Sequence, residues 1–139
     1  MKRLYIVIAD DDDDDRFLLR TAFTENGFQD ELKFITNGYD LLIYLNGVKN
    51  AENVEKLPDF IILDLNMPKK DGREVLSIMK SDEFLSKIPV FVFSTTSNNN
   101  EKKKCLEYGA ISYYTKPVTF DGLIRIAAEI RNTFILLNN

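Results

Sequence analysis

The chain has 139 residues, 45% of them hydrophobic and 29% charged, which is the composition of one globular domain with a full hydrophobic core. With a net charge of −4, nothing in its charge favours binding to nucleic acid or to an anionic membrane. The absence of histidine excludes Ser-His-Asp and Cys-His catalysis, histidine-based zinc sites and a phosphohistidine carrier.

Short apolar runs alternate with segments of helical spacing along the chain. In chain order we predict a strand over 4–9, a helix over 16–23, a strand over 31–36, a helix over 40–45, a strand over 60–64, a helix over 74–82, a strand over 90–94, a helix over 98–108, a strand over 111–115 and a last helix. The last helix carries apolar residues at helical spacing, namely Leu123, Ile126, Ala127, Ile130 and Phe134. Gly47 is predicted to end the second helix, and the polar residues 48–58 to form a loop or an extended helix end.

This strict alternation of strands and helices predicts a parallel sheet with right-handed crossovers and helices on both faces. Five strands of this kind indicate an α/β fold, a doubly wound five-stranded parallel sheet of the flavodoxin-like type. We expect one domain over residues 1–139.

Polar residues lie where four of these strands end. Asp10 and Asp11 follow the first strand, Asp64 ends the third, Ser94 ends the fourth, and Lys116 follows the fifth. Because ligands of open parallel sheets bind beyond the carboxyl ends of the strands, we expect these side chains to form one site.

The chemistry expected from this site is phosphoryl transfer. Crowded carboxylates raise each other's pKa unless a cation lies among them, and oxygen ligands without cysteine or histidine select a hard ion such as Mg²⁺. The Asp64 carboxylate can attack phosphorus to form an aspartyl phosphate. Mg²⁺ and Lys116 would then hold two phosphoryl oxygens, and the Ser94 hydroxyl the third.

Four sequence pieces, YIVIADD, IILDLNMPKKDG, VFVFSTTS and YYTKP, together with their separations, resemble the receiver domain of bacterial two-component response regulators. The resemblance covers essentially the whole chain and implies the (βα)5 receiver fold with no output domain attached. The segment 48–58 and the missing output domain are similar to the small stand-alone receivers paired with bacterial phytochrome kinases.

Several site residues follow from this resemblance. It implies that a sensor histidine kinase or a phosphotransfer protein phosphorylates Asp64. It also implies that Mg²⁺ is bound directly by Asp11, Asp64 and the backbone carbonyl of Asn66, and through water by Asp10. A shift of one residue, which would make the acidic pair Asp11 and Asp12, is also compatible with the aspartate run.

The resemblance further implies a conformational switch. Ser94 and Tyr113 would be the switch residues, with the Tyr113 ring turning inward when the Ser94 hydroxyl moves onto the phosphate. A plain packing role for Tyr113 is the alternative, and Tyr114 should point to the opposite face of the sheet. The peptide bond before Pro117 is expected to be cis, as the family tends to hold it. The signalling surface would comprise the fourth helix, the fifth strand and the last helix.

Two other functions compete with this interpretation. A haloacid-dehalogenase-like phosphohydrolase also uses a strand-end aspartate with Mg²⁺, but it needs a second aspartate where this chain has Asn66. A pseudo-receiver that only binds partners would be expected to lose at least one of the site residues. Asn66 and Thr96 flank the site, and we expect both to tune the lifetime of the acyl phosphate.

The remaining features concern partners and location. Asp13, Asp14 and Asp15 are interpreted as a solvated helix start. The lone Cys105 is interpreted as inert packing and, without a disulfide partner, favours a cytoplasmic location. We expect a downstream protein target but no nucleic-acid or membrane partner. The apolar run 134–137 either packs on the domain or forms a partner contact, so a homodimer is also permitted.

Overall fold

The computed structural model describes residues 3–50 and 57–138, and in this part of the chain five parallel strands form one sheet in the order β2-β1-β3-β4-β5. The strands are β1 (Tyr5–Ala9), β2 (Glu31–Ile35), β3 (Phe60–Leu63), β4 (Val90–Ser94) and β5 (Ser112–Thr115). The helices are α1 (Asp13–Glu25), α2 (Gly38–Asn50), α3 (Gly72–Ser81), α4 (Asn99–Glu107) and α5 (Phe120–Leu137), with a short 3-10 helix η2 (Leu85–Lys87) before β4. The predicted doubly wound α/β fold is confirmed.

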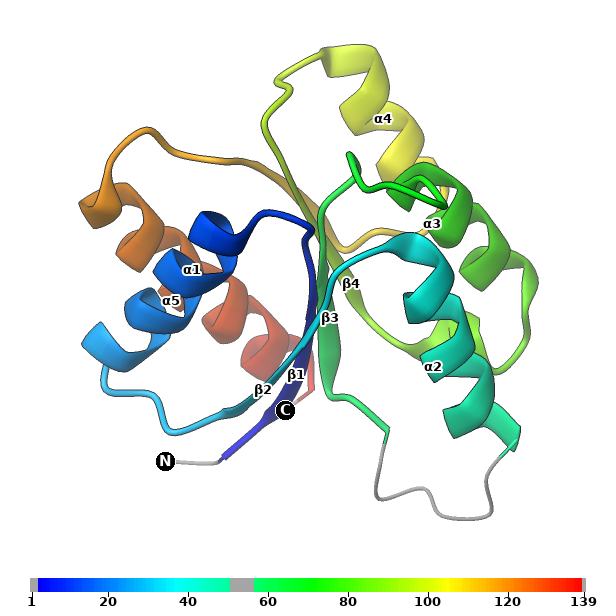
Figure 1. Ribbon diagram of the computed structural model, residues 1–139, viewed down its shortest axis with the longest axis horizontal. Coiled ribbons are helices and arrows are strands. Elements are labelled where there is room, and N and C mark those ends of the chain that lie inside the picture. The colour runs from blue at the N-terminus through cyan, green and yellow to red at the C-terminus, as the bar shows by residue number, and fades with distance from the viewer. Residues whose placement is uncertain (1–2, 51–56, 139) are drawn as a thin grey trace.

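Helices cover both faces of the sheet (Figure 1). α1 and α5 lie on one face, while α2, α3 and α4 lie on the other, and the carboxyl ends of the strands gather at the upper edge in this view. None of the helices described over residues 3–50 and 57–138 is long and apolar enough to cross a membrane.

The central strands are buried on both faces, because alternate side chains enter two separate hydrophobic clusters. In β3, Ile61 and Leu63 pack under α2 and α3, whereas Phe60 and Ile62 pack under α1 and α5. In β5, Tyr113 and Tyr114 divide in the same way, as predicted. Full burial of each such side chain favours folding by about 1.5–3 kcal/mol, so the alternation sets which face each strand residue occupies.

The second helix differs from its prediction. α2 continues past Gly47 to Asn50, so the prediction that Gly47 ends the helix is wrong. Val48 is buried on α2, as are Leu41 and Leu45, and this burial outweighs the cost of about 0.5–1 kcal/mol for a glycine inside a helix. Of the segment 48–58, residues 51–56 lie outside the described part of the chain.

The apolar C-terminal run is divided between core and surface. Phe134 is buried and packs against the Phe60 ring, with ring centroids 5.0 Å apart. Leu136 and Leu137 instead remain exposed at 73% and 59%. The packing alternative is therefore confirmed for Phe134, whereas a partner contact through Leu136 and Leu137 stays a prediction.

Candidate phosphorylation site

Three carboxylates meet at the carboxyl edge of the sheet because β1 and β3 are neighbours in register. Ala9 pairs with Leu63, so the residues that follow, Asp10 and Asp64, lie side by side. The backbone N–H of Asp64 donates to the Ala9 carbonyl at 2.9 Å and continues the pairing. Among the described residues, Asp10, Asp11 and Asp64 form one group whose carboxylate oxygens lie within 4.8 Å of one another. Asp10 and Asp64 are buried, and Asp11 is exposed.

The next aspartate has a different place. The Asp12 side chain accepts a hydrogen bond from the backbone N–H of Asp15 at 2.9 Å and forms the N-cap of α1. The backbone N–H of Asp12 in turn donates to the Asp10 carboxylate at 2.9 Å. The geometry therefore brings Asp10 and Asp11 to Asp64, while Asp12 begins the helix.

Gly72 lets the turn after β3 close onto the site. A Cβ atom at this position would lie 2.4 Å from the Asp64 carbonyl oxygen and 2.7 Å from the Leu65 Cα atom. The Gly72 N–H donates to the Leu65 carbonyl at 2.9 Å, and the Asp71 side chain caps α3. The glycine thus permits a close backbone approach that any side chain would prevent.

Lys116 follows β5 and places its positively charged ammonium next to the carboxylates. Its backbone N–H donates to the Ser94 carbonyl at 2.7 Å, which fixes the chain next to the end of β4. Its ammonium donates to Asp10 at 2.9 Å, to Asp64 at 3.3 Å and to Asp15 at 2.7 Å. The Lys116 ammonium therefore lies at the strand ends, in contact with the carboxylates.

Burial and charge oppose each other in this cluster. Burial raises the pKa of Asp10 to about 6, against the lowering effect of the Asp12 N–H and of Lys116. Burial likewise raises the pKa of Asp64, again opposed mainly by Lys116. For Lys116 burial lowers the pKa, but the hydrogen bonds to Asp15 and Asp10 outweigh it and the net pKa is raised. Burial therefore outweighs the effect of Lys116 and disfavours the ionised form of both carboxylates.

Asp15 is the residue of this site that the sequence interpretation missed. Asp13 and Asp14 are exposed at the start of α1, as expected, but Asp15 forms an ion pair with Lys116. Its interpretation as merely part of a solvated helix start is therefore wrong. The contact joins residues that are 101 positions apart, and no local pattern in the sequence marks it.

The hydroxyl and the aromatic residue lie on neighbouring strands. Ser94 is fully buried at the end of β4, and its Oγ lies 3.4 Å from the backbone nitrogen of Thr96, which donates to it. The Tyr113 ring is also buried, and its hydroxyl donates to the Thr96 carbonyl at 2.7 Å. The ring therefore points inward and is held by the loop that follows Ser94.

Pro117 and Asn66 are close neighbours of the site residues Lys116 and Asp64 in the chain. Among the described residues all peptide bonds are trans, so the expected cis bond between Lys116 and Pro117 is wrong. The trans form is the intrinsically favoured one, and with it the Lys116 ammonium already reaches the carboxylates. Asn66 is exposed beside the site, and its backbone N–H donates to the Asp64 carboxylate at 3.2 Å.

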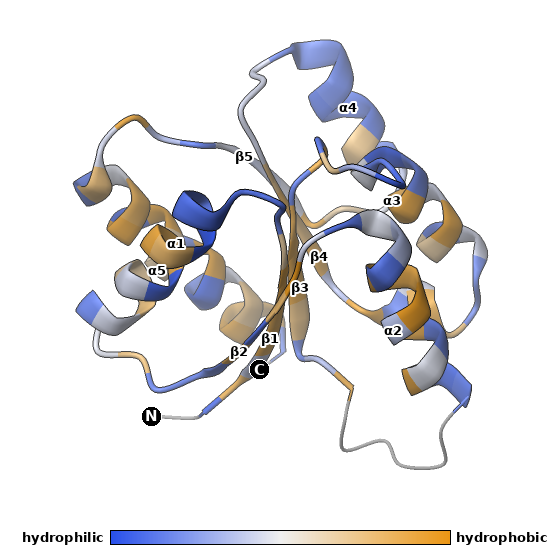
Figure 2. Ribbon diagram, in the orientation of Figure 1, coloured by the Kyte–Doolittle hydropathy of each residue, from blue (hydrophilic) through white to orange (hydrophobic). Residues whose placement is uncertain are grey.

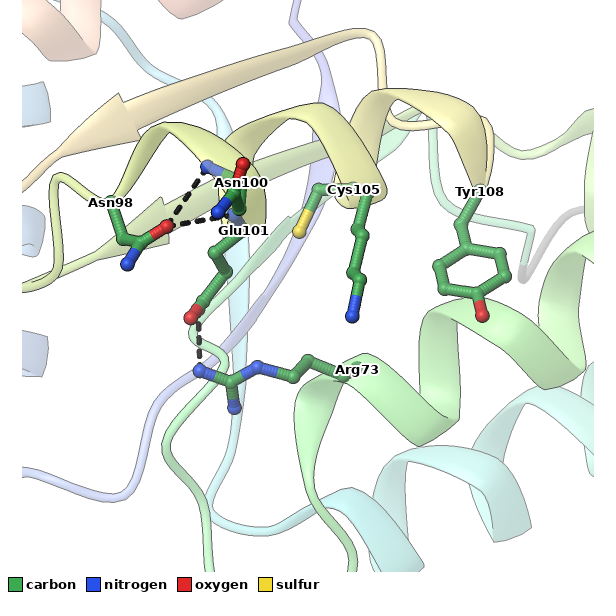
Figure 3. A pocket seen from close by; sticks show the side chains of 7 residues that line it. Arg73, Asn98, Asn100, Glu101, Cys105 and Tyr108 are labelled. Atoms are coloured by element: carbon green, nitrogen blue, oxygen red, sulfur yellow. Dashed lines mark hydrogen bonds and ion pairs between the residues drawn. The ribbon is translucent and has the colours of Figure 1, made fainter.

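A separate cavity of about 250 Å³ lies between α3 and α4, away from the carboxylates (Figure 3). Arg73 extends from α3 and forms an ion pair with Glu101 of α4. Cys105 is buried at this cavity, where burial raises the pKa of its thiol, in keeping with the predicted packing role. Within α4, all of whose residues are described, Cys105 alone is buried, and Figure 2 shows the helix as mainly hydrophilic. α4 thus contributes one buried side chain to the core and is also joined to α3 through the ion pair between Arg73 and Glu101.

Comparisons with known proteins agree with this geometry. The family model of the response regulator receiver domain matches residues 6–128. The probable methanogenesis regulatory protein FilR2 of Methanothrix harundinacea is 32% identical over 94% of this chain and 83% of that protein. The response regulator Rcp1 of Synechocystis is 30% identical over 94% of this chain and 88% of its own.

Solved structures give the same result. The phosphorylated cyanobacterial phytochrome response regulator RcpA superposes with a TM-score of 0.84 at 32% identity, over 96% of this chain and 95% of that one. The Mn²⁺-bound form of Rcp1 superposes with a TM-score of 0.79 at 29% identity, over 91% of each chain. With a family match over most of its length and the acidic cluster at the expected strand ends, the chain belongs to the response regulator receiver domain family, the signalling modules of two-component systems.

Proposed function

We propose that this receiver domain accepts a phosphoryl group on Asp64 in a Mg²⁺-dependent reaction. The observation that carries the proposal is the convergence of Asp10, Asp11, Asp64 and Lys116 at one edge of the sheet. We assign Asp64 as the acceptor because its carboxylate lies within reach of both the other two acids and the Lys116 ammonium. The donor is a phosphohistidine of a sensor histidine kinase or of a phosphotransfer protein, since this chain contains no histidine of its own.

The transfer step forms one bond and breaks another. An Asp64 carboxylate oxygen bonds to phosphorus while the P–N bond to the donor imidazole breaks, and the electron pair of that bond stays with the imidazole. The Lys116 ammonium, 3.3 Å from Asp64, donates to one phosphoryl oxygen. The Ser94 hydroxyl donates to another. These donors compensate the negative charge that the phosphoryl group brings next to the buried carboxylates.

The donor set of the site fits a hard divalent cation. Asp11, Asp64 and the Asn66 backbone carbonyl would bind Mg²⁺ directly, and Asp10 through water, all with oxygen atoms. Burial raises the pKa of Asp10 and of Asp64, and a cation bound beside them would favour their ionised forms. When bound, the cation neutralises the carboxylates and the phosphoryl oxygens. The Mn²⁺-bound form of the relative Rcp1 supports this assignment.

The signal would leave the protein through α4, β5 and α5. Ser94 lies at the end of β4, and Tyr113 of β5 is tied to the intervening loop through the Thr96 carbonyl. A movement of Ser94 toward the phosphate would therefore act on Tyr113 and on α4, which follows the same loop. We propose a downstream protein target for this face. A homodimer through exposed Leu136 and Leu137 is a second outcome of the same arrangement.

The competing functions are less well supported. Asn66 replaces the general acid/base that a haloacid-dehalogenase-like enzyme requires, and the family match is to signalling modules. We therefore propose a phosphoacceptor without turnover of a separate substrate. Complete retention of the carboxylates and of Lys116 speaks against a pseudo-receiver. A reducing, cytoplasmic location rests on the lone cysteine and stays a prediction.

The test is incubation with acetyl phosphate, with and without Mg²⁺, followed by intact mass spectrometry. We expect a gain of one phosphoryl group, about 80 Da, that requires Mg²⁺ and disappears in Asp64→Asn. The matched control Asp14→Asn removes the same charge from an exposed position and should still gain it. A wild-type protein that binds Mg²⁺ but gains no mass would overturn the proposal in favour of a pseudo-receiver.

A further inference from the structure

Lys116 is shared by three carboxylates, and one of them does not come from a strand end. Asp10 and Asp64 follow β1 and β3, whereas Asp15 lies in the first turn of α1. The distance from the Lys116 Nζ atom is 2.7 Å to Asp15, 2.9 Å to Asp10 and 3.3 Å to Asp64. The ammonium therefore lies closer to Asp15 than to the carboxylate that we propose as phosphoacceptor.

The position of Asp15 is set by the backbone of α1. Its backbone N–H donates a hydrogen bond to the Asp12 side chain. The same turn is also held by Arg16, whose guanidinium donates to the Asp10 carbonyl at 2.8 Å. The Asp15 side chain is 35% exposed, in contrast to 5% for Asp10 and 7% for Asp64. Water can therefore replace the Lys116 ammonium as the hydrogen-bond partner of the Asp15 carboxylate. The two buried carboxylates are less accessible to water, so the same replacement is less favourable for them.

The Lys116 ammonium has no N–H donor left over for a phosphoryl group. An ammonium group has three N–H donors, and here each has a carboxylate acceptor. A phosphoryl oxygen on Asp64 can be bound only if one of these contacts is released or lengthened. Asp15 lies outside the group formed by Asp10, Asp11 and Asp64, so a cation bound by that group would not take over the contact.

We propose that Asp15 is a positioning residue that holds Lys116 in the unphosphorylated protein and competes with the phosphoryl group for its ammonium. The inference rests on the proposed function of Asp64. Its consequence is that Asp15 slows the acquisition of the phosphoryl group and weakens its binding. Removing the carboxylate should leave Lys116 free to move toward Asp64.

The experiment compares Asp15→Asn with the matched control Asp14→Asn and with the conservative variant Asp15→Glu. Each is phosphorylated with acetyl phosphate at saturating Mg²⁺, and the rate constant is followed by intact mass spectrometry. The affinity for beryllofluoride, a non-covalent phosphoryl mimic, and the affinity for Mg²⁺ alone are measured by calorimetry. The helix cap is preserved in every variant because Asp12 bonds the backbone, not the side chain, of residue 15.

For Asp15→Asn we expect a rise of about fivefold in the rate constant and in beryllofluoride affinity, or about 1 kcal/mol, as for a partly exposed ion pair. Asp14→Asn should change either quantity by less than about twofold, since its side chain is exposed. Asp15→Glu should stay near the wild type. The Mg²⁺ affinity should be equal in Asp15→Asn and Asp14→Asn, and the rate difference should persist at about 0.5 M salt, where through-space charge effects are screened.

Two results would overturn the proposal while leaving the function of Asp64 intact. One is an equal rate constant for Asp15→Asn and Asp14→Asn, and the other is a slower reaction in Asp15→Asn, which would make Asp15 a support for Lys116 rather than a competitor. Asp15→Ser provides a second neutral side chain should the asparagine variant fold poorly. If the wild type takes up neither phosphoryl nor beryllofluoride, the proposed function itself fails.

Discussion

Replacing Asp10 by asparagine should stabilise the protein while weakening its site. Asp10 is 4% exposed, and burial raises its pKa from 3.8 to about 6. At about 1.4 kcal/mol per pKa unit, this difference means that the ionised carboxylate disfavours the folded state by about 3 kcal/mol at neutral pH. Asparagine has nearly the same shape, and its side-chain oxygen can still accept the hydrogen bond from the Asp12 N–H.

The difference in unfolding free energy between Asp10→Asn and the wild type should increase with pH. Because the folded pKa of Asp10 is raised, protonation of this group adds stability that is fully present below about pH 3.8 and is lost as the pH rises through about 6. Asp10→Asn does not undergo this loss. We therefore expect the variant to exceed the wild type by about 1–3 kcal/mol at pH 7–8, with the difference approaching zero near pH 4. The lower bound allows for the lost contact with Lys116.

Urea unfolding followed by circular dichroism measures this difference, in EDTA and then in Mg²⁺. Added Mg²⁺ should stabilise the wild type more than Asp10→Asn, because ligand binding stabilises only in proportion to its affinity for the folded state. Asp14→Asn is the control for a charge change at an exposed position. The reasoning is refuted if Asp10→Asn is less stable than the wild type at pH 7 in EDTA, or if the difference does not shrink on acidification.

Further predictions concern the turn after β3 and the lifetime of the phosphoryl group. Gly72→Ala should destabilise the protein by about 1–3 kcal/mol in the same unfolding assay, since its Cβ would meet the Asp64 carbonyl oxygen. Gly47→Ala, in open space within α2, should instead stabilise by about 0.5–1 kcal/mol, and similar effects at both glycines would contradict the steric argument. Asn66→Ala and Thr96→Ala should each change the rate of phosphoryl loss after donor removal by more than about threefold, roughly 0.7 kcal/mol; unchanged rates would show that neither residue tunes the lifetime.

Much of the fold and of the candidate site could be predicted from local sequence patterns. Buried parallel strands appear as short apolar runs, and alternation with helices restricts the topology. A carboxylate directly after such a run, as at Asp10 and Asp64, must then lie at the carboxyl edge of the sheet. The pairing of Ala9 with Leu63 shows why this inference succeeds, because strand register alone brings the two acids together.

Other features depended on contacts between distant parts of the chain. The continuation of α2 past Gly47 follows from the burial of Val48, which overrides the local signal of the glycine. The choice of Asp15 as a partner of Lys116 follows from the way in which α1 packs beside the end of β5. Likewise, the buried ion pair between Asp30 and Arg131, at 2.7 Å, joins the start of β2 to α5.

These differences have one physical reason. Periodicity and turn residues report on neighbours a few positions apart, and they suffice for elements whose faces are sorted by burial. Which of several adjacent aspartates receives a lysine is decided by side-chain distances of 2.7–3.3 Å in the folded protein. An unbroken run from Asp10 to Asp15 carries no such information, so only the tertiary structure assigns Asp10 and Asp11 to the carboxylate cluster, Asp12 to the helix cap and Asp15 to Lys116.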